Sequence, residues 1–126
     1  MKTPEQKASY FKGRRNSFYY AFRGLRSLMA TEPNARIHLL ATAMVTALGI
    51  YFPLSLTDWA VLIVVMGMVW VAELFNTCIE KIMDLVHPQK DERVGVIKDL
   101  AAAAVLFTAV IAVLAGCFVF LPHFFR

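Results

Sequence analysis

The chain has 126 residues, of which 59% are hydrophobic and 17% are charged, and its formal net charge is +4. A soluble domain of this size could not bury several long uncharged segments, so the composition favours an integral membrane protein. Basic residues that meet anionic lipid headgroups explain the positive charge, and no nucleic-acid partner is needed to account for it.

The first expected element is an amphipathic helix over residues 10–30. Its large apolar residues recur at helical spacing, with arginines at other positions of the turn: Phe11, Phe18, Phe22, Leu25 and Met29. This pattern is typical of a helix that lies on a membrane surface. Thr31 is a candidate helix cap, and Pro33 suits the first turn of the next helix.

Three membrane-spanning helices are expected next, over residues 35–52, 58–86 and 94–121. Residues 37–57 and 100–125 contain no Asp, Glu, Lys or Arg, and residues 59–83 are mostly apolar. Each segment reaches the roughly 20 residues that a helix needs to cross a bilayer. Thr57 or Asp58 is expected to cap the second span, and Pro122 to end the third. We therefore predict an all-α membrane protein with a single domain over residues 1–126.

Lysine and arginine indicate the orientation of these spans. They are frequent before the first span and between the second and third, and absent from the connection over residues 51–58. The positive-inside rule then predicts a cytoplasmic N-terminus, a cytoplasmic connection between the second and third spans, and a C-terminus outside.

A polar stripe interrupts the second span. Glu73 and Glu80 are seven residues apart, about two helical turns, and therefore share one side of the helix. Asn76 and Thr77 lie between them, and Asp84 follows one turn later. Interhelical hydrogen bonding would explain Asn76 or Thr77 alone. Carboxylates inside a bilayer are costly and usually functional, so the stripe is a candidate site.

Further charged residues belong to the same depth of the membrane. Glu32 precedes the first span, and Lys98 and Asp99 open the third. If the spans are antiparallel neighbours, these residues converge with the stripe near the cytoplasmic interface, while Glu73 lies about 10 Å deeper than Glu80. Carboxylates suit Mg²⁺, a lysine suits phosphate, and a deeper carboxylate suits a lipid hydroxyl. The pattern indicates phosphoryl transfer at a membrane surface.

Two other classes of function compete with this interpretation. A small proton or ion carrier would use Glu73 and Glu80 as relay carboxylates, but it should have polar residues through the whole bilayer depth. Here residues 39–57 and 102–121 have almost none. A structural adaptor leaves the glutamates unexplained. The ion carrier is kept as the alternative.

The stripe, with the sequence E-L-F-N-T-C-I-E at residues 73–80, and K-D-L-A-A-A-A-V-L at residues 98–106 closely resemble the small bacterial membrane diacylglycerol kinase family. That family includes undecaprenol kinases. The resemblance implies an ATP-dependent lipid kinase of the bacterial cytoplasmic membrane, a homotrimer that acts on diacylglycerol or undecaprenol at the cytoplasmic face. Residues 34–38 and 120–122 look more like the members that act on undecaprenol.

The resemblance also implies roles for individual residues. Glu73 matches the general base, and Glu32 and Glu80 match the carboxylates that hold Mg²⁺. The implied ATP-binding residues are Tyr20, Glu32, Asn76, Glu80, Lys98 and Asp99. The implied lipid-binding residues are Arg14, Glu73 and Asp84. A family arginine aligns with Gly13, and Lys12, Arg14 or Arg15 is its replacement.

Overall fold

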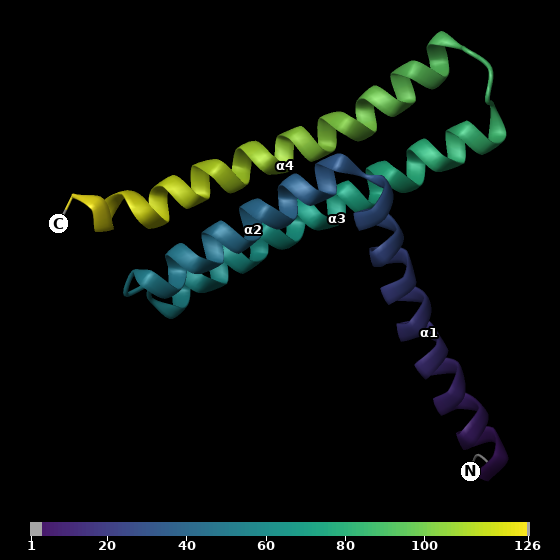
Figure 1. Cartoon of the computed structure of the whole chain (residues 1–126), viewed down its shortest axis with the longest axis horizontal. Coiled ribbons are helices and arrows are strands. Elements are labelled where there is room, and N and C mark those ends of the chain that lie inside the picture. Colours follow the sequence, from purple (N-terminus) through teal and green to yellow (C-terminus); the bar gives the residue numbers. More distant parts are fainter. Residues whose placement is uncertain (1–3, 126) are drawn as a thin grey trace. The chain divides into compact units, whose positions relative to one another are not determined.

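The structure is a computed structural model that describes residues 4–125, with side chains from residue 13 onward. It is all-helical, as predicted, with α1 (Pro4–Thr31), α2 (Pro33–Tyr51), α3 (Leu56–Val86) and α4 (Glu92–Phe124) (Figure 1). The chain divides into two compact units, residues 1–32 and 33–126. The prediction of one membrane domain stays a prediction.

The first unit consists of α1, an amphipathic helix with large exposed side chains. Phe18 and Phe22 are exposed, and the guanidinium of Arg23 lies 5.3 Å from the ring centre of Tyr20. The hydroxyl of Thr31 lies within hydrogen-bond distance of the Ser27 carbonyl, at 3.1 Å, so this candidate cap binds back into α1.

The second unit begins with Pro33, which opens α2 as predicted, because its fixed φ suits the first helical turn. α3 then begins at Leu56, and its N-cap is Ser55. The Ser55 hydroxyl accepts a bond from the Asp58 amide at 3.1 Å, and the Asp58 carboxylate accepts one from the Ser55 amide at 3.0 Å. The prediction that Thr57 or Asp58 is the cap was therefore wrong, since Asp58 is the third residue of a capping box.

α4 is longer than the predicted third span at both ends. Asp91 caps it by accepting a hydrogen bond from the Arg93 amide at 2.8 Å, so the helix begins at Glu92. The Arg93 guanidinium also lies 2.8 Å from the Asp91 carboxylate, which lowers the pKa of Asp91 and raises that of Arg93. The prediction that Pro122 ends the helix was wrong, because α4 continues through Pro122 to Phe124. The fixed φ of proline is itself a helical value.

Within the second unit, α3 packs against α2 and against α4 (Figure 1). The core cluster consists of Leu62, Val119 and Phe120. At the same end, α2 approaches α3 closely at Gly49, where an added Cβ would lie 2.8 Å from the ring of Trp59. The apolar core cluster therefore lies at the end of the unit away from the polar stripe.

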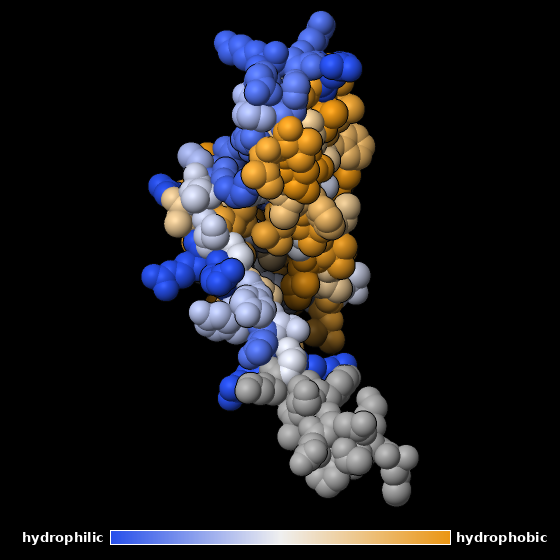
Figure 2. All heavy atoms as spheres, turned by 90° about the vertical axis from the view of Figure 1, so that its right-hand side faces the viewer, coloured by the Kyte–Doolittle hydropathy of each residue, from blue (hydrophilic) through white to orange (hydrophobic). Residues whose placement is uncertain are grey.

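Two described helices, α3 and α4, are long and apolar enough to cross a membrane. Figure 2 shows an apolar flank on the second unit beside hydrophilic residues at the end that carries the α3–α4 connection. Many large apolar side chains are exposed along α3 and α4, including Ile63, Phe107 and Phe118. Such a surface suits lipid or a protein partner, and the chain has membrane character.

Candidate active site

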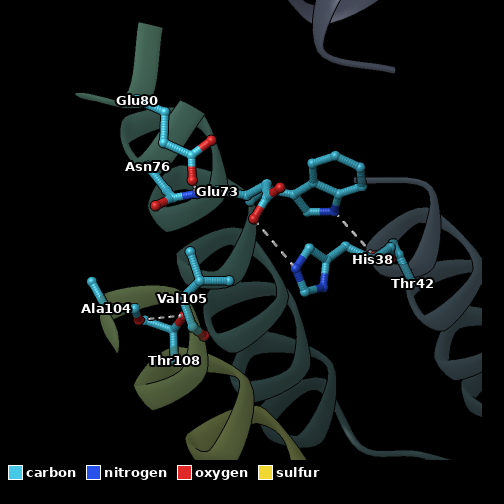
Figure 3. Close-up of polar contacts among 9 residues, drawn as sticks. His38, Thr42, Glu73, Asn76, Glu80, Ala104, Val105 and Thr108 are labelled. Carbon is cyan, nitrogen blue, oxygen red and sulfur yellow. Dashed lines mark hydrogen bonds and ion pairs between the residues drawn. The ribbon is translucent and has the colours of Figure 1, made fainter. Parts of the chain in front are cut away.

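Glu73 is the most deeply buried charged residue that the structure describes. It lies on α3 and is 1% exposed. Its Oε2 atom lies 3.6 Å from Nε2 of His38 on α2, and Figure 3 shows the two side chains pointing toward each other. The predicted general base thus lies between two helices, beside an imidazole.

A chain of contacts holds His38 in place. The hydroxyl of Thr42, one turn along α2, donates to the His38 carbonyl at 2.7 Å. The indole N–H of Trp70 on α3 donates to the Thr42 hydroxyl oxygen at 3.0 Å, and the rings of Trp70 and His38 meet edge to face with centres 6.5 Å apart. Because Trp70 precedes Glu73 by about one helical turn, both residues lie on the same face of α3, and both approach His38.

The rest of the stripe follows Glu73 along α3. Asn76 is buried, and its amide nitrogen donates to Oε1 of Glu80 at 3.2 Å. Among the described residues, Oδ1 of Asn76 and the hydroxyl of Thr77 are buried without a hydrogen-bond partner. Buried polar atoms are rarely left unpaired, so both indicate a ligand or a further chain at this face.

Lys98 and Asp84 meet at the connection between α3 and α4, where the ammonium of Lys98 donates to the carboxylate of Asp84. They line a cavity of about 490 Å³ together with residues of the connection. Asp99 is exposed on the first turns of α4. A free ammonium at this position would suit a phosphate oxygen, so phosphate binding has to compete with Asp84.

Arg14, Tyr20 and Glu32 belong to the first unit. Arg14 and Tyr20 are exposed, and Glu32 is half-buried, with Oε1 2.7 Å from the Thr31 hydroxyl. Arg15 is exposed as well, and the side chain of Lys12 lies outside the described residues. The roles assigned to these residues stay predictions.

The carboxylates of the described residues indicate how a magnesium ion would be held. Among the side chains that the structure describes, no group of three His, Cys, Asp or Glu residues could hold a metal ion. Mg²⁺ that arrives with a nucleotide needs only one or two carboxylates, because phosphates and water supply the other oxygens. Glu80 on α3 is a carboxylate of the kind that such a metal–nucleotide complex needs, and the metal-binding roles predicted for Glu80 and Glu32 stay predictions.

Two pockets share His38 in their linings. The first, of about 260 Å³, has a mostly apolar lining to which Asn34, His38, Glu73 and Asn76 add polar groups. The second is an apolar groove of about 420 Å³ between α2, α3 and α4, and His38 and Thr42 lie among its lining residues. A buried carboxylate therefore lies in a pocket next to an apolar groove, which suits proton removal from an amphiphilic molecule.

Sequence analysis did not single out His38, Thr42 or Trp70. His38 and Thr42 are four residues apart, so they share a face of α2, and this spacing was the available signal. Trp70 gave no signal, because a tryptophan inside an apolar span usually indicates packing.

Comparison with known proteins places the chain in a family. Residues 19–120 match the family described as prokaryotic diacylglycerol kinase. The chain is 35% identical to an undecaprenol kinase of Bacillus subtilis, over 84% of this chain and 86% of that protein. It is 36% identical to a diacylglycerol kinase of Synechocystis, over 84% and 61% of the two chains, and 27% identical to a diacylglycerol kinase of Escherichia coli, over 83% and 86%. These findings do not favour an ion carrier. The chain belongs to the prokaryotic diacylglycerol kinase family and is a lipid kinase.

Proposed function

We propose that the protein transfers the γ-phosphoryl group of ATP to the hydroxyl of a membrane lipid alcohol, with Glu73 as the general base. The observation that carries this proposal is the position of Glu73, a buried carboxylate beside the end of an apolar groove. A lipid chain in the groove would bring its hydroxyl to a group that can take its proton.

The chemistry balances without a covalent intermediate. The lipid oxygen attacks the γ-phosphorus while the Glu73 carboxylate accepts the hydroxyl proton. The bond between the γ-phosphorus and the bridging oxygen breaks, and ADP leaves with the electron pair. Lys98, released from Asp84, compensates negative charge on the phosphates. Glu32 and Glu80 are the carboxylates that we assign to Mg²⁺, which would supply positive charge to the phosphate oxygens.

Undecaprenol is the substrate we propose, with diacylglycerol as the competitor. Along α2 the groove extends from His38 to Leu48, a rise of about 15 Å at 1.5 Å per residue. Its lining is almost entirely apolar, which suits one long hydrocarbon chain. The identities of 35% to an undecaprenol kinase and 36% to a diacylglycerol kinase are nearly equal, so the choice depends on the shape of the groove.

The membrane arrangement is part of the same proposal. α2 has 19 residues and would be about 28 Å long, close to the thickness of a hydrocarbon core. We therefore propose that α2 crosses the membrane in addition to α3 and α4. We place the protein in the bacterial inner membrane with the α3–α4 connection and the N-terminus in the cytoplasm. Arg14 would then contact the lipid headgroup region, and Tyr20 and Asp99 the nucleotide.

Phosphate transfer from radiolabelled ATP to undecaprenol and to diacylglycerol in mixed micelles tests the proposal. We expect labelled lipid, with a higher kcat/KM for undecaprenol. Glu73→Gln should lower kcat by about 10²–10⁴-fold, because an amide cannot accept the proton. The control is retained helical content and ATP binding by the variant. A variant with near-normal kcat would remove Glu73 from the role of base.

A further inference from the structure

We propose that His38 is a positioning residue for this reaction: its Nε2–H holds Oε2 of Glu73, so that Oε1 is directed toward the lipid hydroxyl. The inference rests on the proposed role of Glu73. The two atoms are 3.6 Å apart, longer than a hydrogen bond. Hydrogen bonds at catalytic sites are often long in unliganded structures and shorten when substrate binds.

The pocket beside Glu73 presents the imidazole of His38 on its α2 side. Besides Glu73 and His38, this pocket is lined by Asn34, Asn76 and apolar residues, the latter from α2 and α4. Glu73 and His38 are therefore the titratable groups among the lining residues that the structure describes. The amide nitrogen of Asn76 is engaged with Glu80. The imidazole is a donor that faces the base from the opposite helix.

A donor at this place has a chemical effect beyond packing. Burial in an apolar environment disfavours an ionised carboxylate, and only the ionised form can accept a proton from the lipid. An N–H directed at one oxygen favours the ionised form and fixes the rotation of the carboxylate. The Trp70–Thr42 bond joins α2 to α3 without His38, so the imidazole is not needed as the link between the helices.

The orientation of the ring is itself controlled. The rings of Trp70 and His38 meet edge to face, and the Thr42 hydroxyl accepts from the Trp70 indole and donates to the main-chain carbonyl of His38. The ring contact restricts rotation of the imidazole, whose Nε2 is directed toward Glu73 on α3. Loss of the Thr42 hydroxyl removes the acceptor of the Trp70 indole, so it should disturb Glu73 through the contact between Trp70 and His38.

Five variants test the inference: His38→Leu and His38→Ala, which remove the donor; His38→Gln, which keeps an amide donor; Thr42→Val; and Thr46→Val. Thr46 is the matched control, because its hydroxyl makes the same bond to a carbonyl one turn earlier, at 2.7 Å to Thr42. We expect kcat to fall about 100-fold in His38→Leu, the scale of a misplaced catalytic group, with the KM for ATP unchanged. His38→Gln and Thr42→Val should lose less, and Thr46→Val should match the wild type.

Two readouts separate positioning from a purely structural role. Without the donor, the carboxylate ionises less readily, so the acidic limb of the kcat–pH profile should move to higher pH in His38→Leu. Added imidazole should restore part of the kcat of His38→Ala.

The inference is overturned if His38→Leu keeps the wild-type kcat and pH profile and Glu73→Gln is inactive. If His38→Leu does not fold, equal kcat in His38→Gln and His38→Ala with no imidazole rescue would overturn it. An active Glu73→Gln would instead overturn the proposed function.

Discussion

Gly116 lies on α4 in the lining of the apolar groove, where an added Cβ would meet nothing within 4 Å. Gly116→Leu should place a branched side chain in the space that we assign to the lipid. We expect the KM for lipid to rise about 10–100-fold, since loss of a few methylene contacts amounts to about 1–3 kcal/mol. The KM for ATP should stay the same, and the two are compared with the other substrate saturating.

Gly67→Leu is the control for this substitution. Gly67 also has open space at its Cβ, but it is not among the residues that line the groove. Both changes raise helix propensity by a similar amount, so a difference between them reports on the groove. An unaltered lipid KM in Gly116→Leu would place the lipid chain elsewhere.

At the scale of single residues, the sequence predicted a polar stripe but not the neighbour that faces it. Glu73, Asn76 and Glu80 share a helix face by spacing alone, and Asn76 does bind Glu80 in the structure. The pairing of Glu73 with His38 joins residues 35 positions apart, and no periodicity within one helix carries that information. It depends on the register of α2 against α3, which side-chain packing sets.

The contact between α2 and α3 at Gly49 is expected to limit stability. Gly49→Ala would bring a methyl group to 2.8 Å from the Trp59 ring and 3.2 Å from Leu54, so the neighbours must shift. Overpacking of this kind costs about 1–3 kcal/mol. Gly116→Ala, with open space around its Cβ, is the matched control and should be neutral or stabilising. Thermal unfolding in detergent measures both, and equal melting temperatures would contradict the tight contact.

At the scale of elements, the existence of four helices was predictable and their ends were not. Long apolar runs and helical spacing indicate a helix over many residues, so single errors average out. A helix end depends on one or two capping bonds. Ser55 and Asp91 start α3 and α4 because their side chains reach the next free amides, and the neighbouring Thr57 and Asp58 competed in the sequence with Ser55 for that role.

We propose a homotrimer with sites between protomers, and mixed oligomers test it. Glu32 and Glu73 lie in different units of the chain, whereas Glu73 and Glu80 lie on one helix. If Glu32 of one site comes from a neighbouring protomer, Glu73→Gln mixed with Glu32→Gln should regain part of the activity. The control mixture, Glu73→Gln with Glu80→Gln, should stay inactive. No recovery in the first mixture, or monomers alone in active micelles, would contradict shared sites.

At the scale of the whole molecule, sequence patterns carry little information about how the chains assemble. In a soluble protein, an apolar stripe indicates the face that packs. On α4 nearly every face is apolar, because lipid and a neighbouring helix both accept the same side chains. The trimer therefore comes from the family resemblance, while the number of helices and their apolar character come from the sequence itself.

The two tryptophans of the chain give the molecule an optical property. Both lie on α3, and Trp59 covers Gly49 while the Trp70 indole touches the His38 ring. The emission of an indole depends on the polar groups that lie against it. In a Trp59→Phe background, fluorescence therefore comes from Trp70 alone and reports on the contact between Trp70 and His38. The protein carries its own light signal for a change in the surroundings of Glu73, without an attached label.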